Sequence, residues 1–580
     1  MTTEPASLHP SAERRGSEPT ADLAALFTPK LVTVLREGYS PRHLGADVIA
    51  GLTVAIVALP LSMAIAVASG VTPERGLYAA VFGGFLVSAL GGSRFQIGGP
   101  AGAFIVLVAA TVQRHGVDGL LLATLISGVL LAGLGWLRLG TYIKFVPYPV
   151  TVGFTAGIAV IILASQVRDL LGLRLGGPEP GPILEKLPVL WAGLPTAIPA
   201  AVAVAGATIG LVLLVRRLRP RWPAMLIAMA ATAVGSALLS LPVETIGSRF
   251  GGLPAGLPMP ALPPISPGAI VAVLPDAIAF ALLGGIESLL SAVVADGMTG
   301  RRHRSNCELV GQGVANIASA LFGGLCVTGT IARTATNVRA GAHGPVAGMA
   351  HSLFVLGFLL VAAPLARYVP LATLAGILAV VAWTMAEKHA AAALLRSGRG
   401  EAAVLVVTFA LTVLRDLTEA IVVGVALGAL LIIHRLSAAT AVESTVPPVE
   451  EDRADTEGAA RTPYEPGPGA AGEIAIHRIR GAFFFGAAAA VGTLLERLPG
   501  RPKALIVDFA DVPFIDATAA KTIDGLLDKA ARRGVAVTLT GTTPAMRRLL
   551  VGQGLKPPRV VYKRTVEDAV AAAQARLTDG

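Results

Sequence analysis

The feature that most restricts the fold of this chain is a long central block with very few charged side chains. The sequence has 47 basic and 37 acidic residues, and only 39 of these 84 lie between residues 46 and 436, about one position in ten. The flanking residues reach about one in four, as soluble proteins do. We therefore predict a polar N-terminal tail at 1–45, a membrane domain at 46–436, a linker at 437–470 and a water-soluble domain at 471–580.

Fourteen apolar segments in this block qualify as membrane spans, since about 20 apolar residues cross the hydrocarbon layer. Eight are continuous: 50–68, 119–137, 150–171, 198–215, 224–241, 277–294, 348–363 and 421–433. Six are shorter or are interrupted by glycine and proline: 76–90, 99–112, 310–325, 327–338, 371–383 and 404–414. We predict a polytopic all-α membrane domain of fourteen spans that divides as seven plus seven.

The charges in the loops predict the orientation of this domain. The loops after the even-numbered spans are the basic ones, with Arg138, Lys144, Arg216, Arg217, Arg219, Arg221, Arg301, Arg302, Arg304, Lys388, Arg396, Arg399 and Arg435. Basic loops stay in the cytoplasm, so we expect both termini and the C-terminal domain there. The net charge of +10 is then explained by the membrane, and we expect no nucleic-acid partner.

Several function classes are disfavoured by what the sequence lacks. Its two cysteines, Cys307 and Cys326, rule out a disulfide framework, and neither belongs to a CxxC motif of a structural zinc site. We find no catalytic triad, P-loop motif or metal-binding cluster in the sequence. We therefore expect a protein that is not an enzyme and that uses no cofactor and no metal.

Two interrupted spans occupy matching places in the two halves. Span three opens with Gly98-Gly99-Pro100-Ala101-Gly102, and span ten opens with Val327-Thr328-Gly329-Thr330. Matched interruptions of this kind point to a transporter site, where the N-terminus of each half-helix offers free N–H groups to an anion. The substrate-binding candidates are Gly99, Pro100, Ala101, Thr328, Gly329 and Thr330. The alternative is that these glycines only allow close helix packing.

Two charged residues lie deep within spans, where charge is costly and is usually functional. Glu287 in span eight could take up a proton or pair with a sodium ion, and Ser291 lies one turn further on the same face. The alternative for Glu287 is a structural hydrogen bond to a neighbouring helix. Arg333, one turn into span ten, could balance an anion or Glu287; the alternative is a buried Arg–Glu pair without a substrate role.

Several stretches resemble the SulP family of anion transporters, which includes bacterial sulfate, bicarbonate and dicarboxylate permeases. The similar stretches follow the family order: 47–60, Gly76-Leu-Tyr78, Gly99-Pro100, 286–290, 306–313 and 328–339. The resemblance implies two inverted repeats of seven spans. Spans one to four and eight to eleven would form a core domain that moves like an elevator against a gate domain of the remaining spans. It places the anion between the starts of spans three and ten, and the coupling-ion carboxylate at Glu287.

Departures from the family pattern bear on the coupling ion. Leu61-Ser62 follows the proline of span one, as in the bacterial branch that contains sodium–bicarbonate symporters. Those symporters have Asp and Thr where this chain has Glu287 and Ser291, and glutamate is commoner in members coupled to protons. We therefore expect a proton as the coupling ion, with sodium as the alternative. Cys326 replaces a proline that is frequent before span ten.

The region after residue 470 alternates between strand and helix patterns, which predicts a small α/β domain. The expected strands are 474–479, 504–508 and 535–540, and the expected helices are 487–498, 517–533 and 544–552. Pro513-Phe-Ile-Asp516-Ala-Thr518 resembles the strand-to-helix loop of STAS domains, in which anti-sigma-factor antagonists carry a phosphorylatable serine at the position of Thr518. Asp516 and Thr518 are regulatory candidates, and we favour helix capping by Thr518 over phosphorylation. The domain is expected to dimerise the protein or to bind a cytoplasmic partner.

Together these features predict a secondary active importer of small anions in the bacterial inner (cytoplasmic) membrane. Proton-coupled symport of sulfate is the favoured activity. Sodium-coupled bicarbonate transport, proton-coupled dicarboxylate transport and an anion uniporter or channel are the alternatives within this class. A membrane-anchored sensor that signals through its STAS domain is the alternative from a different class.

Overall fold

The computed structural model describes residues 26–143, 147–177, 179–219, 222–254, 256–415, 417–444, 473–485 and 502–578. The chain forms two compact units, Met1–Val425 and Ala426–Gly580. The predicted helix at 487–498, most of the linker, and the loop residues Lys144 and Arg221 lie outside the described residues.

The first half of the membrane domain is helical, with one short strand. Its elements are α2 (Lys30–Arg36), α3 (Pro41–Ala68), α4 (Pro73–Tyr78), the π-helical turn η1 (Ala79–Gly83), α5 (Gly84–Leu90), β1 (Gly98–Gly99), the 3₁₀ turn η2 (Gly102–Phe104), α6 (Ile105–Trp136), α7 (Gly140–Ile143), α8 (Tyr148–Leu171), α9 (Ile183–Gly193), η3 (Leu194–Thr196), α10 (Pro199–Leu218), α11 (Ala224–Leu238) and α12 (Ile246–Phe250). Predicted spans three and four are the two arms of α6. The arms meet at Gly116, whose φ of 67° breaks the helical path without a separate loop.

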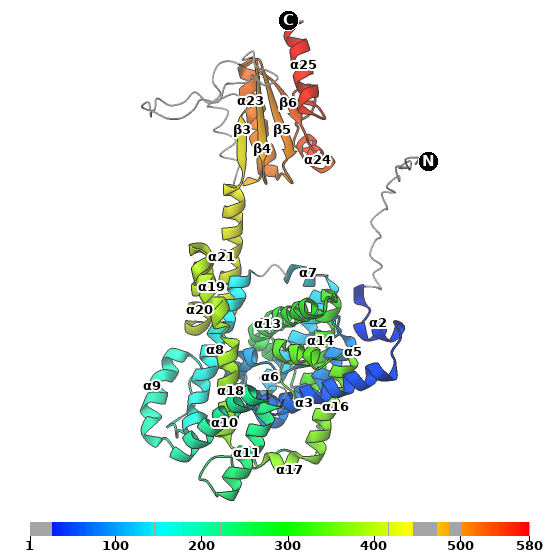
Figure 1. Cartoon of the computed structure of the whole chain (residues 1–580). Helices are drawn as coiled ribbons and strands as arrows, with labels where there is room; N and C mark the ends of the chain where they lie inside the picture. The colour runs from blue at the N-terminus through cyan, green and yellow to red at the C-terminus, as the bar shows by residue number, and fades with distance from the viewer. Residues whose placement is uncertain are drawn as a thin grey trace, which may run out of the picture. The chain divides into compact units, whose positions relative to one another are not determined.

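The second half of the membrane domain is also helical and also contains one short strand (Figure 1). Its elements are α13 (Pro267–Thr299), α14 (Ser305–Leu321), β2 (Thr328–Gly329), α15 (Ile331–Arg339), α16 (Val346–Val361), α17 (Ala363–Ala366), α18 (Leu371–Met385), α19 (Lys388–Ser397), α20 (Arg399–Leu414) and α21 (Leu417–Ala438). Every predicted span falls on one or more of these helices. In the described residues, seven helices are long and apolar enough by themselves to cross a membrane. The chain is therefore a multi-pass membrane protein.

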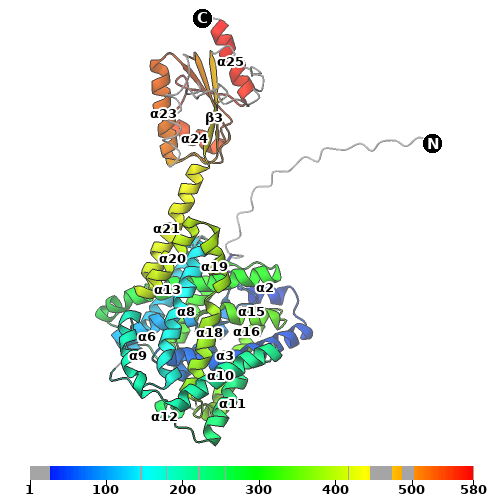
Figure 2. The ribbon, with the colours of Figure 1, turned by 60° about the vertical axis from the view of Figure 1, so that its left-hand side comes forward.

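Packing separates the helices into two groups, as the resemblance implies. In one group α16 packs along α3, while α13 and α14 pack along α6. In the other group α8 packs against α18 and α20 (Figure 1 and Figure 2). Gly128 of α6 and Gly313 of α14 allow one close approach, because a Cβ on Gly128 would lie 2.7 Å from the Gly313 carbonyl oxygen.

The C-terminal unit contains a five-stranded sheet in the order β3-β4-β5-β6-β7. Its elements are β3 (Ala441–Ser444), β4 (Ile474–Arg480), β5 (Ala504–Asp511), α23 (Ala517–Arg532), β6 (Ala536–Thr540), α24 (Pro544–Gly552), β7 (Val561–Tyr562) and α25 (Val566–Thr578). Only β3 runs antiparallel to its neighbour. Alternate residues of β5 face opposite layers: Leu505 packs with α23 and α24, and Ile506 packs with α25. The ribbon shows α23 and α25 on opposite sides of the strands (Figure 2).

The predicted α/β domain is confirmed by this sheet. The three expected strands correspond to β4, β5 and β6, and two of the expected helices correspond to α23 and α24. The sequence did not reveal β3, β7 or α25. Because β3 lies at 441–444, the sheet takes one strand from the region that composition assigns to the linker.

Candidate functional site

The interrupted starts of spans three and ten pair with each other in the structure. Strands β1 and β2 run antiparallel, with Gly98 opposite Gly329 and Gly99 opposite Thr328. Strand β1 leads through Pro100 into η2 and α6, while β2 leads directly into α15. Two segments from opposite halves of the membrane domain therefore form one buried unit with a half-helix starting at each end.

The N-termini of both half-helices lack side-chain caps. The residues in the cap positions are Ala101 before η2 and Thr330 before α15, and neither side chain accepts a hydrogen bond from its helix. The first N–H groups of a helix have no partner within the helix, so a cap, water or a ligand has to supply the acceptor. Ala101 is buried, and Thr330 is partly buried. Such N–H groups can hydrogen-bond an anion without a cationic side chain.

A buried guanidinium lies beside these strands. Arg333 of α15 is 1% exposed, and its Nη2 donates to the Pro100 carbonyl oxygen at 3.1 Å and to Ser62 Oγ at 3.3 Å. Its Nε and Nη1 have no hydrogen-bond partner among the described residues. A Cβ on Gly99 would lie 2.2 Å from Arg333 Nη1, so only glycine leaves room for this guanidinium. The result is a buried positive charge with unused donors next to the paired strands.

Glu287 of α13 is the second charged residue near this unit. Its Oε2 is buried and has no hydrogen-bond partner among the described residues. Its neighbour Ser288 bonds directly to β2, which places this part of α13 against the strand pair. Within the described residues no ion pair joins Glu287 to Arg333. In this structure Arg333 therefore does not balance Glu287 through a direct ion pair, and its role stays a prediction.

Ser291 serves as a tie between elements in this structure. It is fully buried, and its hydroxyl donates to Thr334 Oγ1 of α15 at 3.0 Å. Thr334 Oγ1 also accepts a hydrogen bond from the backbone N–H of Ile97, the residue before β1, at 3.2 Å. The hydroxyl predicted to help hold a coupling ion thus links α13, α15 and the approach to β1.

A buried polar network behind the strands was not identified from the sequence. Ser288 Oγ accepts the Gly329 N–H at 3.1 Å and donates to Thr328 Oγ1 at 2.8 Å, and Thr328 donates to the Gly284 carbonyl oxygen at 3.0 Å. Gln96 Nε2 donates to the Ser288 carbonyl oxygen at 3.1 Å and to Glu308 at 3.0 Å. These bonds fix β2 on α13.

Glu308 of α14 anchors this network. It is completely buried and accepts hydrogen bonds from Ser93 N–H at 2.9 Å and from Gln312 Nε2 at 3.1 Å, in addition to the bond from Gln96. The stretch 306–313 contributes to the family resemblance, and this was the available signal. Glu308 was missed because it follows the basic loop at Arg301–Arg304 and so resembles an interfacial residue.

In the STAS-like loop the helix cap is Asp516 and not Thr518. Asp516 has an extended backbone, and its Oδ1 accepts the Ala519 N–H at 2.8 Å while Oδ2 accepts the Phe485 N–H at 3.1 Å. Thr518 is the second residue of α23, and a capping side chain must precede the first helical residue. The favoured capping role of Thr518 is therefore wrong. Its side chain is exposed.

Two protein-family models match the chain. The model described as "Sulfate permease family" matches residues 44–408, and the model described as "STAS domain" matches residues 470–569. YvdB of Bacillus subtilis (strain 168), provisionally named a sulfate transporter, is 39% identical over 90% of this chain and 95% of its own. The bicarbonate transporter BicA of Synechocystis is 31% identical over 88% of this chain and 90% of its own.

Solved structures show the same architecture. The murine anion transporter Slc26a9 in the inward-facing state superposes with a TM-score of 0.83 at 19% identity, covering 97% of this chain and 96% of that chain. The transmembrane domain of a cyanobacterial BicA superposes with a TM-score of 0.60 at 31% identity, covering 66% of this chain and 98% of that domain. With the sulfate permease match over more than half of its length, the chain belongs to the sulfate permease family of anion transporters and carries a C-terminal STAS domain.

Proposed function

We propose that this protein imports sulfate by proton-coupled symport, with an elevator movement of the core helices against the gate helices. The observation that carries the proposal is the β1–β2 pair, which joins two uncapped half-helix starts beside the unpaired guanidinium of Arg333. The substrate anion would lie between Gly99–Ala101 and Thr328–Thr330 and accept hydrogen bonds from the uncapped first N–H groups of η2 and α15. Pro100 has no N–H group, and those of Gly329 and Thr330 already donate to Ser288 and Ile97. Arg333 would supply positive charge without being neutralised by a carboxylate of the described protein.

Glu287 is the proposed proton carrier. An ionised carboxylate beside the strand pair would repel a divalent anion, and protonation removes that repulsion. For an assumed separation of roughly 8 Å and an effective dielectric constant of roughly 20, a unit charge and a divalent anion repel by about 4 kcal/mol. Protonation of Glu287 would therefore favour anion binding, which is the coupling that symport requires. We also propose that the Ser291 hydroxyl, on the same helix face, supplies a second oxygen for the coupling ion.

Uptake into proteoliposomes tests this proposal. We expect an inward proton gradient to accelerate uptake of labelled sulfate by the wild-type protein and to have no such effect on Glu287→Gln. Glu419→Gln, which changes an exposed carboxylate of α21, is the matched control and should behave as wild type. Gradient-insensitive wild-type uptake, or gradient-driven uptake by Glu287→Gln, would contradict proton coupling through this residue.

Sodium-coupled bicarbonate transport is the second candidate, because two BicA proteins are 29% and 31% identical to this chain. In the same vesicles, labelled bicarbonate and an inward sodium gradient replace sulfate and the proton gradient. Sodium-driven bicarbonate uptake without sulfate uptake would favour this candidate. Uptake that responds to neither gradient would indicate a uniporter or channel.

The location of the termini and the assembly belong to the proposal as well. The basic loops support cytoplasmic termini, and a STAS domain exposed to the cytoplasm could pair with a second copy or bind a regulatory protein through the surface around Asp516 and Thr518. Protease digestion of inside-out membrane vesicles should remove the STAS domain, and right-side-out vesicles should protect it. Cross-linking in intact membranes would test the homodimer.

A further inference from the structure

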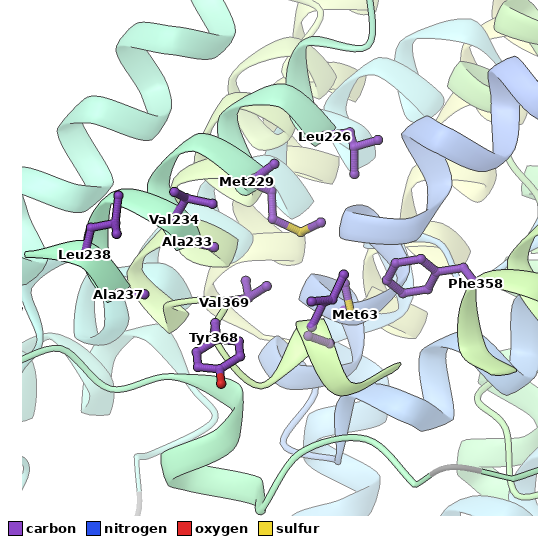
Figure 3. A pocket seen from close by; sticks show the side chains of 13 residues that line it. Met63, Leu226, Met229, Ala233, Val234, Ala237, Leu238, Phe358, Tyr368 and Val369 are labelled. Carbon is purple, nitrogen blue, oxygen red and sulfur yellow. The ribbon is translucent and has the colours of Figure 1, made fainter. Parts of the chain in front are cut away.

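An apolar cavity of about 400 Å³ lies between helices assigned to the core and a helix assigned to the gate. Met63 of α3 and Phe358 of α16 lie across the cavity from Met229 and Ala233 of α11 (Figure 3). Leu365 and Ala366 at the end of α17, with Tyr368 and Val369 just after it, line a further side. Its volume is within the range of small-molecule pockets, roughly 300–1,000 Å³.

The chemistry of the cavity wall excludes an anion as its occupant. The side chains that line it are aliphatic, aromatic or thioether groups, and Tyr368 brings the single hydroxyl. An anion there would lose its hydration without gaining hydrogen bonds, which costs several kcal/mol. The cavity therefore differs from the β1–β2 site in the ligand that it can bind, and it suits a hydrocarbon.

The opening of the cavity lies on the part of the protein that faces the bilayer. Val234 and Leu238 of α11 are 58% and 80% exposed, and Leu365 is 67% exposed, although all three line the cavity. Apolar side chains exposed on membrane helices are in contact with lipid tails, so acyl chains are the hydrocarbon present at this opening. No comparable hydrocarbon is available from the aqueous phase.

A positive charge stands beside the opening. The guanidinium of Arg367 lies over the ring of Tyr368, with Cζ 5.5 Å from the ring centroid, and Arg367 is exposed. It forms no ion pair among the described residues, and guanidinium groups bind phosphate in a bidentate manner. Tyrosine is favoured at the boundary between hydrocarbon and head groups. The pair marks a position for a phosphate at that boundary.

We propose that this cavity binds a phospholipid, with one acyl chain between α3, α16 and α11 and the phosphate at Arg367. An apolar interior, an opening toward the bilayer and an unpaired arginine beside it together match the two ends of a phospholipid. The site goes beyond the transport activity, and binding can be measured whether or not the protein carries sulfate.

Photo-cross-linking in proteoliposomes tests the acyl-chain part. The probe is a phosphatidylglycerol with a diazirine on its acyl chain, diluted into unlabelled phosphatidylglycerol and phosphatidylethanolamine, and labelled peptides are identified by mass spectrometry. We expect labelling of the Met229–Leu238 and Phe358–Val369 peptides. Ala233→Phe should reduce it about tenfold, since displacing two methylene groups already weakens binding by that factor.

Matched variants keep this test decisive. Ala231→Phe places the same side chain on an exposed position of α11 that does not line the cavity, and it should label as wild type. Val234→Trp covers the opening from an exposed position, so it reduces labelling even if Ala233→Phe fails to fold. The acyl-chain site would be overturned if Val234→Trp were labelled as strongly as the wild-type protein. It would also be overturned if Ala231→Phe lost as much labelling as Ala233→Phe.

A second comparison tests the head group. Arg367→Gln should lower labelling by the phosphatidylglycerol probe several-fold and leave labelling by a diazirine diacylglycerol unchanged. Arg174→Gln, which changes an exposed arginine elsewhere, should affect neither probe. Equal labelling by both probes in wild type and in Arg367→Gln would refute phosphate recognition by Arg367. These readouts need no transport, so a failed transport proposal would leave them unaffected.

Discussion

Gly99→Ala should impair anion binding by displacing the guanidinium of Arg333. The new Cβ would lie 2.2 Å from Nη1, whereas an ordinary contact begins at 3.4 Å, so the guanidinium has to move by at least the difference between these distances. The bond from Nη2 to the Pro100 carbonyl oxygen is already 3.1 Å long and would break with a shift of that size away from the strand. Arg333 is 1% exposed, so packing leaves it little freedom to adjust.

The energy of this lost hydrogen bond determines how far the KM for sulfate should rise. Hydrogen bonds to charged groups contribute about 1.5–3 kcal/mol. If anion binding depends on the position of the guanidinium, the KM for sulfate should rise roughly 10- to 150-fold. Initial rates of sulfate uptake into proteoliposomes at several concentrations separate this KM effect from a change in the maximal rate.

Two further variants decide whether the effect passes through Arg333. Gly133→Ala, in α6, adds the same methyl group where no atom lies within 4 Å, and its KM should equal that of wild type. In an Arg333→Met background, Gly99→Ala should add less than about twofold, since coupled sites are not additive. A wild-type KM for Gly99→Ala, or a full additional loss in the Arg333→Met background, would refute the reasoning.

Three other perturbations have defined outcomes. Thr328→Val removes the hydroxyl between Ser288 and Gly284 and should destabilise the protein by about 1–3 kcal/mol in thermal unfolding, while Thr336→Val, at an exposed hydroxyl that bonds only within its own helix, should cost far less. A fragment beginning at residue 439 should melt higher and aggregate less than one beginning at 471, because β3 covers the edge of β4. Burial lowers the pKa of His477, so the folded domain resists protonation of this side chain. The free energy of unfolding should be highest above the ordinary pKa near 6.5 and should fall as the pH drops below it. His477→Gln should make the free energy of unfolding depend less on pH in this range. An unchanged pH slope in His477→Gln would assign the titration to another group.

The spans and the two half-helix starts could be predicted because their signals are local. Apolar length, loop charge and the glycine-rich openings at Gly98 and Gly329 can each be read within a single span and its adjoining loop. The alternation of strand and helix patterns after residue 470 likewise predicted β4, β5 and β6, which form the parallel part of the STAS sheet with β7. The break between predicted spans three and four depends on one backbone angle, the φ of 67° at Gly116, so its geometry could not be predicted from the pattern.

The polar partners could not be predicted because they come from distant segments. Arg333 bonds to the Pro100 carbonyl, 233 positions away, and Ser291 donates to Thr334 of another helix. Spacing along one helix cannot show that such a hydroxyl is already engaged. The capping error at Thr518 has a different cause, since Asp516 offers the same chemistry two residues earlier.

The pairing of β1 with β2 also affects how the protein is made. During synthesis β1 is complete long before β2, at residues 328–329, because all the helices from α6 to α14 are translated between them. Until then the N–H and C=O groups of Gly98 and Gly99 lack the partner that shields them, and each unpaired backbone group in hydrocarbon costs several kcal/mol. The nascent first half therefore depends on the insertion machinery or on water to protect this segment. If translation stops before residue 328, the product should be degraded rapidly by membrane proteases.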